Sequence, residues 1–212
     1  MILDTAYMIT AFVTLLVVID PVAIAPIFLA LTPGMDSEQR ARIALRAVLV
    51  AGLILAIFAF FGKAVLDFVG ISMAAFRVAG GVLLFLTAMD MLFERRTKRR
   101  EDSSEVTDSE HDDPSVFPIA IPLVAGPGAI ASVILLVGEK PGGEGLVSIL
   151  GITAVILLIM YVMLLLSSGL ERAMGKVAIN VTTRVLGMLL AALSVQFVLD
   201  GLAEFGFVTP VV

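Results

Sequence analysis

The first apolar run of the chain contains a carboxyl group and two prolines, and no other feature constrains the fold as strongly. Asp20, Pro21 and Pro26 lie within residues 7–31, which are otherwise mostly apolar. Proline lacks an amide hydrogen and its ring clashes with the carbonyl one turn back, so each proline is expected to interrupt a helix. An unpaired Asp at mid-membrane costs roughly 2.5–3.5 kcal/mol on insertion scales. A segment that keeps these three residues is typical of a broken helix that lines a protected site.

Further apolar runs make this chain a polytopic membrane protein. Hydrophobic residues make up 59% of its 212 residues and charged residues 16%, and the mean hydropathy is +1.08. A soluble domain of this size has too little interior to bury so much apolar surface. We therefore predict an all-α fold with six transmembrane helices, at residues 7–31, 44–62, 71–93, 117–137, 146–168 and 184–203.

Residue types on which many enzymes rely are scarce. The chain has no cysteine, and its single histidine, His111, lies in an acidic stretch. Thiol nucleophiles and cysteine metal sites are thereby excluded. Neither a Ser-His pair nor a pair of acids is placed at mid-membrane depth. We expect no catalytic residue, no metal site and no cofactor, and hence no enzyme.

The basic residues indicate which ends of the spans face the cytoplasm. If the N-terminus lies outside, the inner loops hold eleven of the 14 basic residues, as the positive-inside rule favours. Both termini are then expected outside. The inner loop at 94–116 is polar and lacks aromatic residues, so we expect a disordered cytoplasmic linker. Its basic run at 95–100 adjoins a span and therefore indicates topology and lipid contact rather than binding of nucleic acid.

Two parts of the chain repeat. A shift of 106 residues places 21–25 on 127–131, although Asp20 then has no acidic counterpart. A shift of 107 places the third span on the sixth, with Thr87 opposite Ser194. Apolar helices share residues by chance, but agreement of several spans on nearly one shift indicates an internal repeat.

The second repeat is expected to run inverted relative to the first, because each holds three spans, an odd number. We predict two inverted three-helix repeats, at 1–93 and 117–212, with broken first and fourth helices. At 1.5 Å per residue, Asp20 lies about 20 Å from one face and Pro127 about 15 Å from the other, so both breaks lie near the midplane. Inverted repeats with a midplane site are the architecture of secondary transporters. Proline kinks that only shape packing are the alternative.

Four stretches of the chain carry distinctive motifs. They are Asp20-Pro21-x-x-x-x-Pro26-x-Phe28-Leu29-Ala30-Leu31-Thr32, Phe76-Arg77-Val78-Ala79-Gly80-Gly81, Pro122-Leu123-x-x-Gly126-Pro127-Gly128, and Gly187 to Phe197. These stretches resemble the MarC family of bacterial inner-membrane proteins, which is related to the LysE-type exporters. The resemblance implies six spans in the bacterial cytoplasmic membrane and, for some members, transport of small neutral amino acids such as glycine or alanine. The family usually has Asn at the position of Asp20 and Gly at that of Ala23.

Together these features predict a secondary transporter of small solutes with its site at the midplane, between the two broken helices. Half-helix N-termini offer amide hydrogens to a substrate carboxylate, and freed carbonyls suit an ammonium or a cation. Asp20 is the expected coupling group, for H⁺ or Na⁺, because Asp can titrate where Asn cannot. The candidate substrate-binding residues are Asp20, Pro21, Ala23, Pro26, Thr87, Gly126, Pro127, Gly128 and Ser194.

Other interpretations stay open at this point. The hydroxyls of Thr87 and Ser194 can instead bond to carbonyls of their own helices. Arg77 and Arg184 begin the third and sixth spans and are expected to act as interface anchors. A passive channel or a non-transporting membrane scaffold is the alternative function. The expected partners are the lipid bilayer and a small solute, with a homo-oligomer left open and no nucleic acid.

Overall fold

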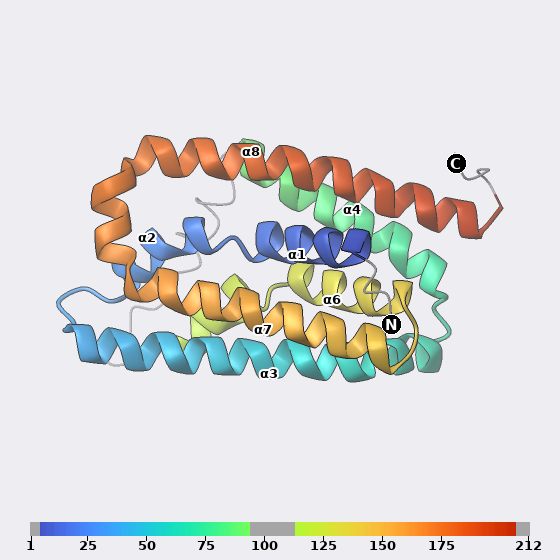
Figure 1. Cartoon of the computed structure of the whole chain (residues 1–212), viewed down its shortest axis with the longest axis horizontal. Helices are drawn as coiled ribbons and strands as arrows, with labels where there is room; N and C mark the ends of the chain where they lie inside the picture. The colour runs from blue at the N-terminus through green and yellow to red at the C-terminus, as the bar shows by residue number, and fades with distance from the viewer. Residues whose placement is uncertain (1–4, 94–112, 207–212) are drawn as a thin grey trace.

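Helices account for nearly all of the residues that the structure, a computed structural model, describes, namely 5–93 and 113–206. In chain order they are α1 (Thr5–Ile19), α2 (Pro21–Leu31), α3 (Ser37–Val69), α4 (Met73–Leu92), η1 (Ser115–Val124), α6 (Pro127–Glu139), α7 (Gly143–Leu165) and α8 (Ser167–Glu204). No strand occurs in these two ranges. Most of the helices lie roughly along one long axis (Figure 1). The all-α prediction is confirmed.

The helices are also long enough to cross a membrane several times. Five candidate spans pass by length and composition, with α1 and α2 together as the first, and a sixth is added if η1 and α6 form one bent span. The prediction of a polytopic membrane protein is confirmed at this level. Of the predicted linker, 94–112 lies outside the described residues, whereas Ser115 and Val116 belong to η1.

α3 is much longer than the span predicted at 44–62 because both of its ends are capped. The Asp36 carboxylate accepts from the backbone N–H of Gln39 at 2.8 Å, and the Gln39 side chain accepts from the Asp36 N–H at 3.1 Å. This capping box starts the helix at Ser37, and Gly70, with φ 81°, ends it. At 1.5 Å per residue α3 is about 50 Å long, so both ends extend beyond a hydrocarbon core of about 30 Å.

α8 also exceeds its prediction. It is helical over Ser167–Glu204, whereas we predicted the sixth span only at 184–203. Gly175 has φ 66° and ψ 164°, a conformation that glycine adopts readily and that turns the path of the chain there. The long section after this turn, Val177–Glu204, packs along α4 (Figure 1).

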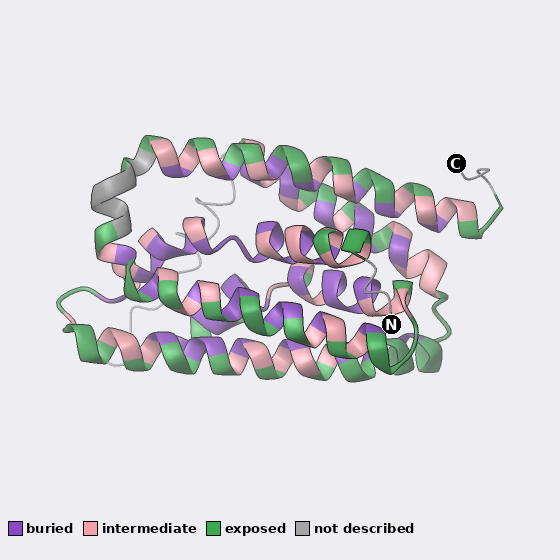
Figure 2. Cartoon of the chain, in the orientation of Figure 1, coloured by how far each residue is buried: buried purple, intermediate pink, exposed green. Residues whose placement is uncertain are grey.

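The distribution of buried and exposed side chains fits a bilayer environment. Buried residues are concentrated on α1, α2 and α6, whereas the outer faces of α3, α7 and α8 carry large exposed apolar side chains (Figure 2). Leu49 is 62% exposed and Leu53 is 63% exposed. An apolar surface of this extent is unfavourable in water and favourable against lipid chains. These faces therefore contact the bilayer.

Close contact between α4 and α8 depends on glycine. A Cβ atom added to Gly81 would lie 2.8 Å from the carbonyl oxygen of Ser194, and one added to Gly187 would lie 3.3 Å from that of Ala88. Small residues let two helix backbones approach closely inside a membrane. The two pairs follow opposite directions along the helices, so α4 and α8 are antiparallel.

We expect Gly81→Val to lower stability, because its Cβ would press on the backbone of α8. The loss should be roughly 1–3 kcal/mol, as at other overpacked sites. Gly151 on α7 is the matched control, since nothing lies within 4 Å of a Cβ added there. Melting temperatures of the purified protein in detergent compare the two variants. Equal effects of Gly81→Val and Gly151→Val would contradict the close α4–α8 contact.

Candidate functional site

The first break in the apolar sequence lies at a single residue. α1 ends at Ile19 and α2 begins at Pro21, with Asp20 between them. Asp20 has φ 55° and ψ 68°, a left-handed conformation that Asp adopts more readily than most residues other than glycine. Pro21 takes the first position of α2, where a missing amide is harmless. One helix therefore ends and another starts without a loop.

The Asp20 carboxylate caps the second half of this span. Its Oδ1 accepts a hydrogen bond from the backbone N–H of Ala23 at 3.3 Å, and Asp20 is fully buried. The negative charge thus faces the positive end of the α2 dipole. α2 continues through Pro26, so our prediction that each proline interrupts the helix was wrong there. Proline removes only one helical hydrogen bond, and membrane helices tolerate that loss when neighbouring elements compensate.

The second break separates η1 from α6, which meet at an angle of 54°. Within η1, Phe117 and Ile121 have extended backbone conformations, as the residue before a proline prefers. The peptide bonds that join them to Pro118 and Pro122 are cis. Regular α-helix therefore begins only at α6, well inside the apolar run.

The start of η1 is tied to α3 by Asp113. Its Oδ1 accepts from the backbone N–H of Ser115 at 2.9 Å, and its Oδ2 accepts from Arg46 at 2.5 Å. Burial raises the pKa of Asp113, but the hydrogen bonds from Ser115 and Arg46 outweigh burial and hold this pKa below its ordinary value of 3.8. The carboxylate is therefore ionised at neutral pH.

α6 starts at a proline as α2 does, but without a side-chain cap. Pro127 is its first residue, and the preceding Gly126 has no side chain to accept a hydrogen bond. A Cβ on Gly126 would lie 2.5 Å from the carbonyl oxygen of Pro122, so glycine is required there. Because Pro127 has no amide, the first N–H groups of α6 belong to Gly128 and Ala129. The second break presents an uncapped helix N-terminus where the first presents a carboxylate.

The two breaks lie near each other. A Cβ added to Gly128 would lie 3.2 Å from Cγ1 of Val18 on α1 and 3.7 Å from Oγ1 of Thr87 on α4. At the far end of the same helices, the Tyr7 hydroxyl donates to the carbonyl oxygen of Leu136 at 2.8 Å. α1 and α6 therefore run side by side, and both breaks lie about 15–20 Å from that end at 1.5 Å per residue.

Two predicted contact residues bond to their own helices. Oγ1 of Thr87 donates to a carbonyl of α4 at 3.0 Å, and Oγ of Ser194 donates to a carbonyl of α8 at 2.7 Å. This is the alternative that the sequence left open for both hydroxyls. Thr87 nevertheless lies beside Gly128, whereas the backbone of Ser194 packs against Gly81.

The sequence did not draw attention to two other buried hydroxyls. Thr14 on α1 is fully buried and Thr153 on α7 is 4% exposed. Within the described part of the chain, neither Oγ1 has a hydrogen-bond partner. α1 and α7 pack together, so both hydroxyls lie in the core beside the first span. A threonine in an apolar run is a weak signal, because it usually bonds to its own helix.

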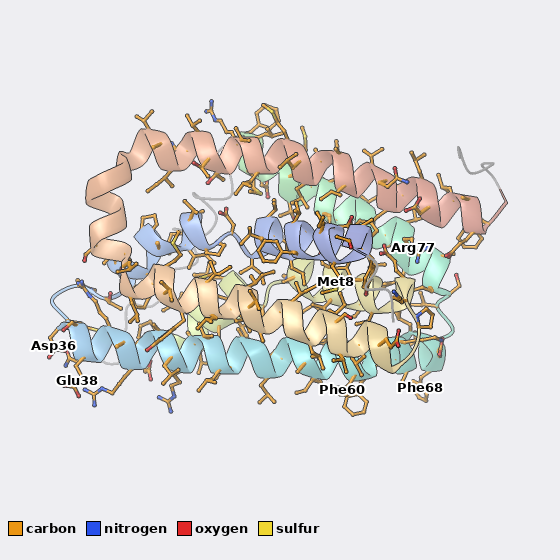
Figure 3. The ribbon with its side chains drawn as sticks, viewed as in Figure 1. Met8, Asp36, Glu38, Phe60, Phe68 and Arg77 are labelled. Atoms are coloured by element: carbon orange, nitrogen blue, oxygen red, sulfur yellow. The ribbon has the colours of Figure 1, made fainter. Side chains whose placement is uncertain are left out.

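Arg77, which we predicted to be an interface anchor, is buried in the protein near one end of the bundle. It is 8% exposed and forms an ion pair with Glu204 near the end of α8. A guanidinium can be buried when a counter-ion is present, and the length of α8 supplies one. The partners are 127 positions apart, so no local pattern could reveal the pair. Figure 3 shows Arg77 at the opposite end of the bundle from Asp36 and Glu38.

A polar cavity of about 830 Å³ opens beside Arg77. Its walls come from α1, α4, α6, α8 and the α6–α7 connection, and its charged residues are Arg77, Glu139, Lys140, Asp200 and Glu204. Neither Asp20 nor a residue of the second break lines it. Across 5–93 and 113–206, no group of three or more His, Asp or Glu residues is arranged to hold a metal ion. The polar cavity is thus a separate region from the two breaks.

Comparison with known proteins reveals relatives of nearly the whole chain. A sequence model described as "MarC family integral membrane protein" matches residues 5–205. A UPF0056 membrane protein of Archaeoglobus fulgidus is 36% identical over 206 residues, covering 94% of this chain and 93% of the relative. The UPF0056 membrane protein YvbG of Bacillus subtilis is 34% identical over 200 residues, covering 93% and 94%. No solved structure matches the chain at a significant level.

Two substitutions of Asp20 distinguish the role of backbone geometry at the first break from the role of its charge. Asp20→Asn keeps a capping oxygen and a residue that tolerates positive φ, so we expect a melting temperature close to that of the unaltered protein. Asp20→Ala loses the cap and strains the left-handed position, each worth roughly 1–2 kcal/mol. Thermal unfolding in detergent measures both variants. If Asn destabilises as much as Ala, the cap and the backbone conformation are not what hold the break.

Proposed function

The chain belongs to the MarC family of integral membrane proteins, and we propose that it is a secondary transporter of small neutral amino acids such as glycine and alanine. One observation carries the proposal. A carboxylate at one break and an uncapped helix N-terminus at the other lie near each other inside the bundle. The names of the relatives state only that they are membrane proteins, so the solute is inferred from the chemistry of the breaks.

The two breaks together suit a zwitterion. An ammonium group is the natural counter-ion for Asp20, which would exchange its bond from Ala23 for one from the solute. The N–H groups of Gly128 and Ala129 can donate to the solute carboxylate, because a helix N-terminus attracts anions. A solute that carries both charges on one carbon satisfies both breaks at once.

The close packing around the second break disfavours a large solute. Val18, Leu84 and Thr87 surround Gly128, and a Cβ added there would contact all three. Ala129 and Ala131, which have small side chains, are buried on the same helix. A hydrogen or a methyl group on the solute fits such surroundings better than a branched or aromatic side chain. This supports glycine and alanine over leucine or phenylalanine.

The repeat predicted from the sequence, in inverted form, is part of the proposal. α2 and α6 begin at Pro21 and Pro127, which are 106 residues apart. Each follows the N-cap residue of its helix, which is Asp20 in one case and Gly126 in the other. Breaks at equivalent positions support a first and a fourth span that are both discontinuous, as in transporters built from inverted repeats.

The crossing of α4 and α8 supports the inversion. Gly81 meets Ser194, and Ala88 meets Gly187. A shift of Gly81 forward by 107 gives residue 188, and a shift of Ser194 back by 107 gives residue 87. Each lies one position from a member of the second pair, Gly187 and Ala88. A two-fold axis in the membrane plane exchanges contacts in this way. The proposed repeats are 1–93 and 117–212.

Asp20 is the proposed coupling group, for H⁺ or Na⁺. A buried carboxylate is unfavourable in hydrocarbon, and a bound proton or cation neutralises it. The solute ammonium has the same effect, so solute and coupling ion both act on one residue. A conformational change that switches access to Asp20 from one side of the membrane to the other then requires a bound proton, cation or solute.

A passive channel or a non-transporting scaffold is the alternative. Asp20 is fully buried, and neither Asp20 nor Gly128 lines the polar cavity. The breaks are therefore not reached through that cavity in this conformation. A buried coupling residue is typical of a carrier that opens to one side at a time, which favours transport over an open pore.

Counterflow in proteoliposomes tests the proposal. Vesicles loaded with unlabelled glycine should accumulate labelled glycine, and alanine and serine should exchange where leucine does not. Asp20→Asn should slow exchange roughly tenfold or more and remove its pH dependence, because it loses a charged contact with the ammonium. Absence of exchange with every amino acid would leave the scaffold. Ion conductance in planar bilayers without a solute gradient would favour the channel.

We also propose that the chain lies in the bacterial cytoplasmic membrane with both termini outside. Because it has no native cysteine, single cysteines can report this orientation. A membrane-impermeant maleimide should label Glu144→Cys in intact cells, since Glu144 is exposed at the end of the bundle where α7 begins. Glu38→Cys, exposed at the opposite end, should react only after lysis. The reverse pattern would show that the termini face the cytoplasm.

A further inference from the structure

The polar cavity plays no part in the site at the breaks, yet its size suits a small ligand. Its volume of about 830 Å³ lies within the range of small-molecule sites, which is about 300–1,000 Å³. Tyr7 and Thr10 line it from α1, Gln196 and Asp200 from α8, and Glu139 from the end of α6. The lining therefore brings together elements from both ends of the chain.

The charged residues of the polar cavity do not balance. Three carboxylates, from Glu139, Asp200 and Glu204, face two cations, Arg77 and Lys140. When all five are ionised, one negative charge is left over. A ligand that brings a positive group to this cavity is therefore favoured electrostatically over a ligand that carries only negative charge.

The existing contacts show which carboxylates remain for a ligand. Glu204 pairs with Arg77, and Lys140 lies over the Tyr7 ring with its Nζ 5.6 Å from the ring centre. Within the described residues, the hydrogen bond that Asp200 accepts is a neutral one, from Gln196 at 2.7 Å.

Within the described residues, neither Glu139 nor Asp200 forms an ion pair. Glu139, Asp200 and Arg77 all line the polar cavity. An ammonium group at Glu139 and Asp200 would relieve the repulsion between these two carboxylates.

Arg77 offers the complementary donor. One of its terminal nitrogens donates to Glu204, but its Nε has no hydrogen-bond partner although the residue is only 8% exposed. A buried donor without a partner is unfavourable. The planar guanidinium is suited to a carboxylate, which can accept from two of its nitrogens together. The same cavity thus holds unbalanced acids and an incompletely bonded arginine.

We propose that the polar cavity is a second binding site for small zwitterionic solutes. Glu139 and Asp200 bind the ammonium group, and Arg77 binds the carboxylate. This inference rests on the proposed transport function for its physiological meaning, since the cavity then holds the solute on its way to or from the breaks. Binding in the cavity is nevertheless a property of these residues and is measured independently of transport.

Isothermal titration of the purified full chain with glycine tests the site. Glu139→Gln and Asp200→Asn should each weaken glycine binding roughly tenfold, because each removes a charged acceptor. Glu144→Gln is the matched control, since Glu144 is exposed at the same end of the bundle and does not line the cavity. It should leave the affinity unchanged. Arg77→Lys, which keeps the charge but loses the planar fork, should weaken glycine and spare ethylamine.

Probes that carry a single charge, and measurements in Asp20→Asn protein, distinguish binding in the cavity from binding at the breaks. Ethylamine and propionate should both bind less tightly than glycine. In Asp20→Asn protein, Glu139→Gln should still weaken glycine binding. If counterflow fails while this dependence persists, the transport proposal is wrong and the cavity site stands. Equal glycine affinity in Glu139→Gln, Asp200→Asn and unaltered protein, tighter binding of propionate than of glycine, or no glycine binding at all would overturn the cavity site.

Discussion

A carboxylate buried in the middle of an apolar span must be met by hydrogen-bond donors, and here the donor comes from the helix that the carboxylate itself begins. The left-handed backbone of Asp20 ends α1 and lets its Oδ1 accept from Ala23, while Pro21 starts α2. The rest of the architecture accommodates this break. α6 packs its own N-terminus beside α1, and the wide contact between α4 and α8 holds the outer layer in place.

The two breaks are similar in local structure but present different chemical groups. Each second half-helix starts at a proline, but Asp20 precedes one and Gly126 precedes the other. One N-terminus is therefore occupied by the protein's own carboxylate and the other is uncapped. This difference gives the proposed site a polarity that matches a zwitterion. The polar cavity near Arg77 has charges of both signs as well, so the same class of solute suits both regions.

The limits of sequence reasoning follow from the range of each interaction. The break at Asp20 was predictable because an acid and a proline act on their own backbone. The apolar runs likewise predicted an all-α membrane protein. The ion pair of Arg77 could not be predicted, because its partner, Glu204, is supplied by a helix whose length no local pattern fixes. The prediction that Pro26 interrupts the helix failed for a related reason. Contacts with the surrounding helices let α2 tolerate one missing hydrogen bond.

The central claim is that the solute binds between the two breaks, and chemical protection tests it most directly. Thr87 is partly exposed and lies beside Gly128, and a cysteine placed there would be the only thiol in the chain. The rate at which a small maleimide modifies Thr87→Cys in membranes is measured with and without solute. The account predicts that glycine slows this modification and leucine does not. An unchanged rate at saturating glycine, in protein that exchanges glycine, would contradict a site between the breaks.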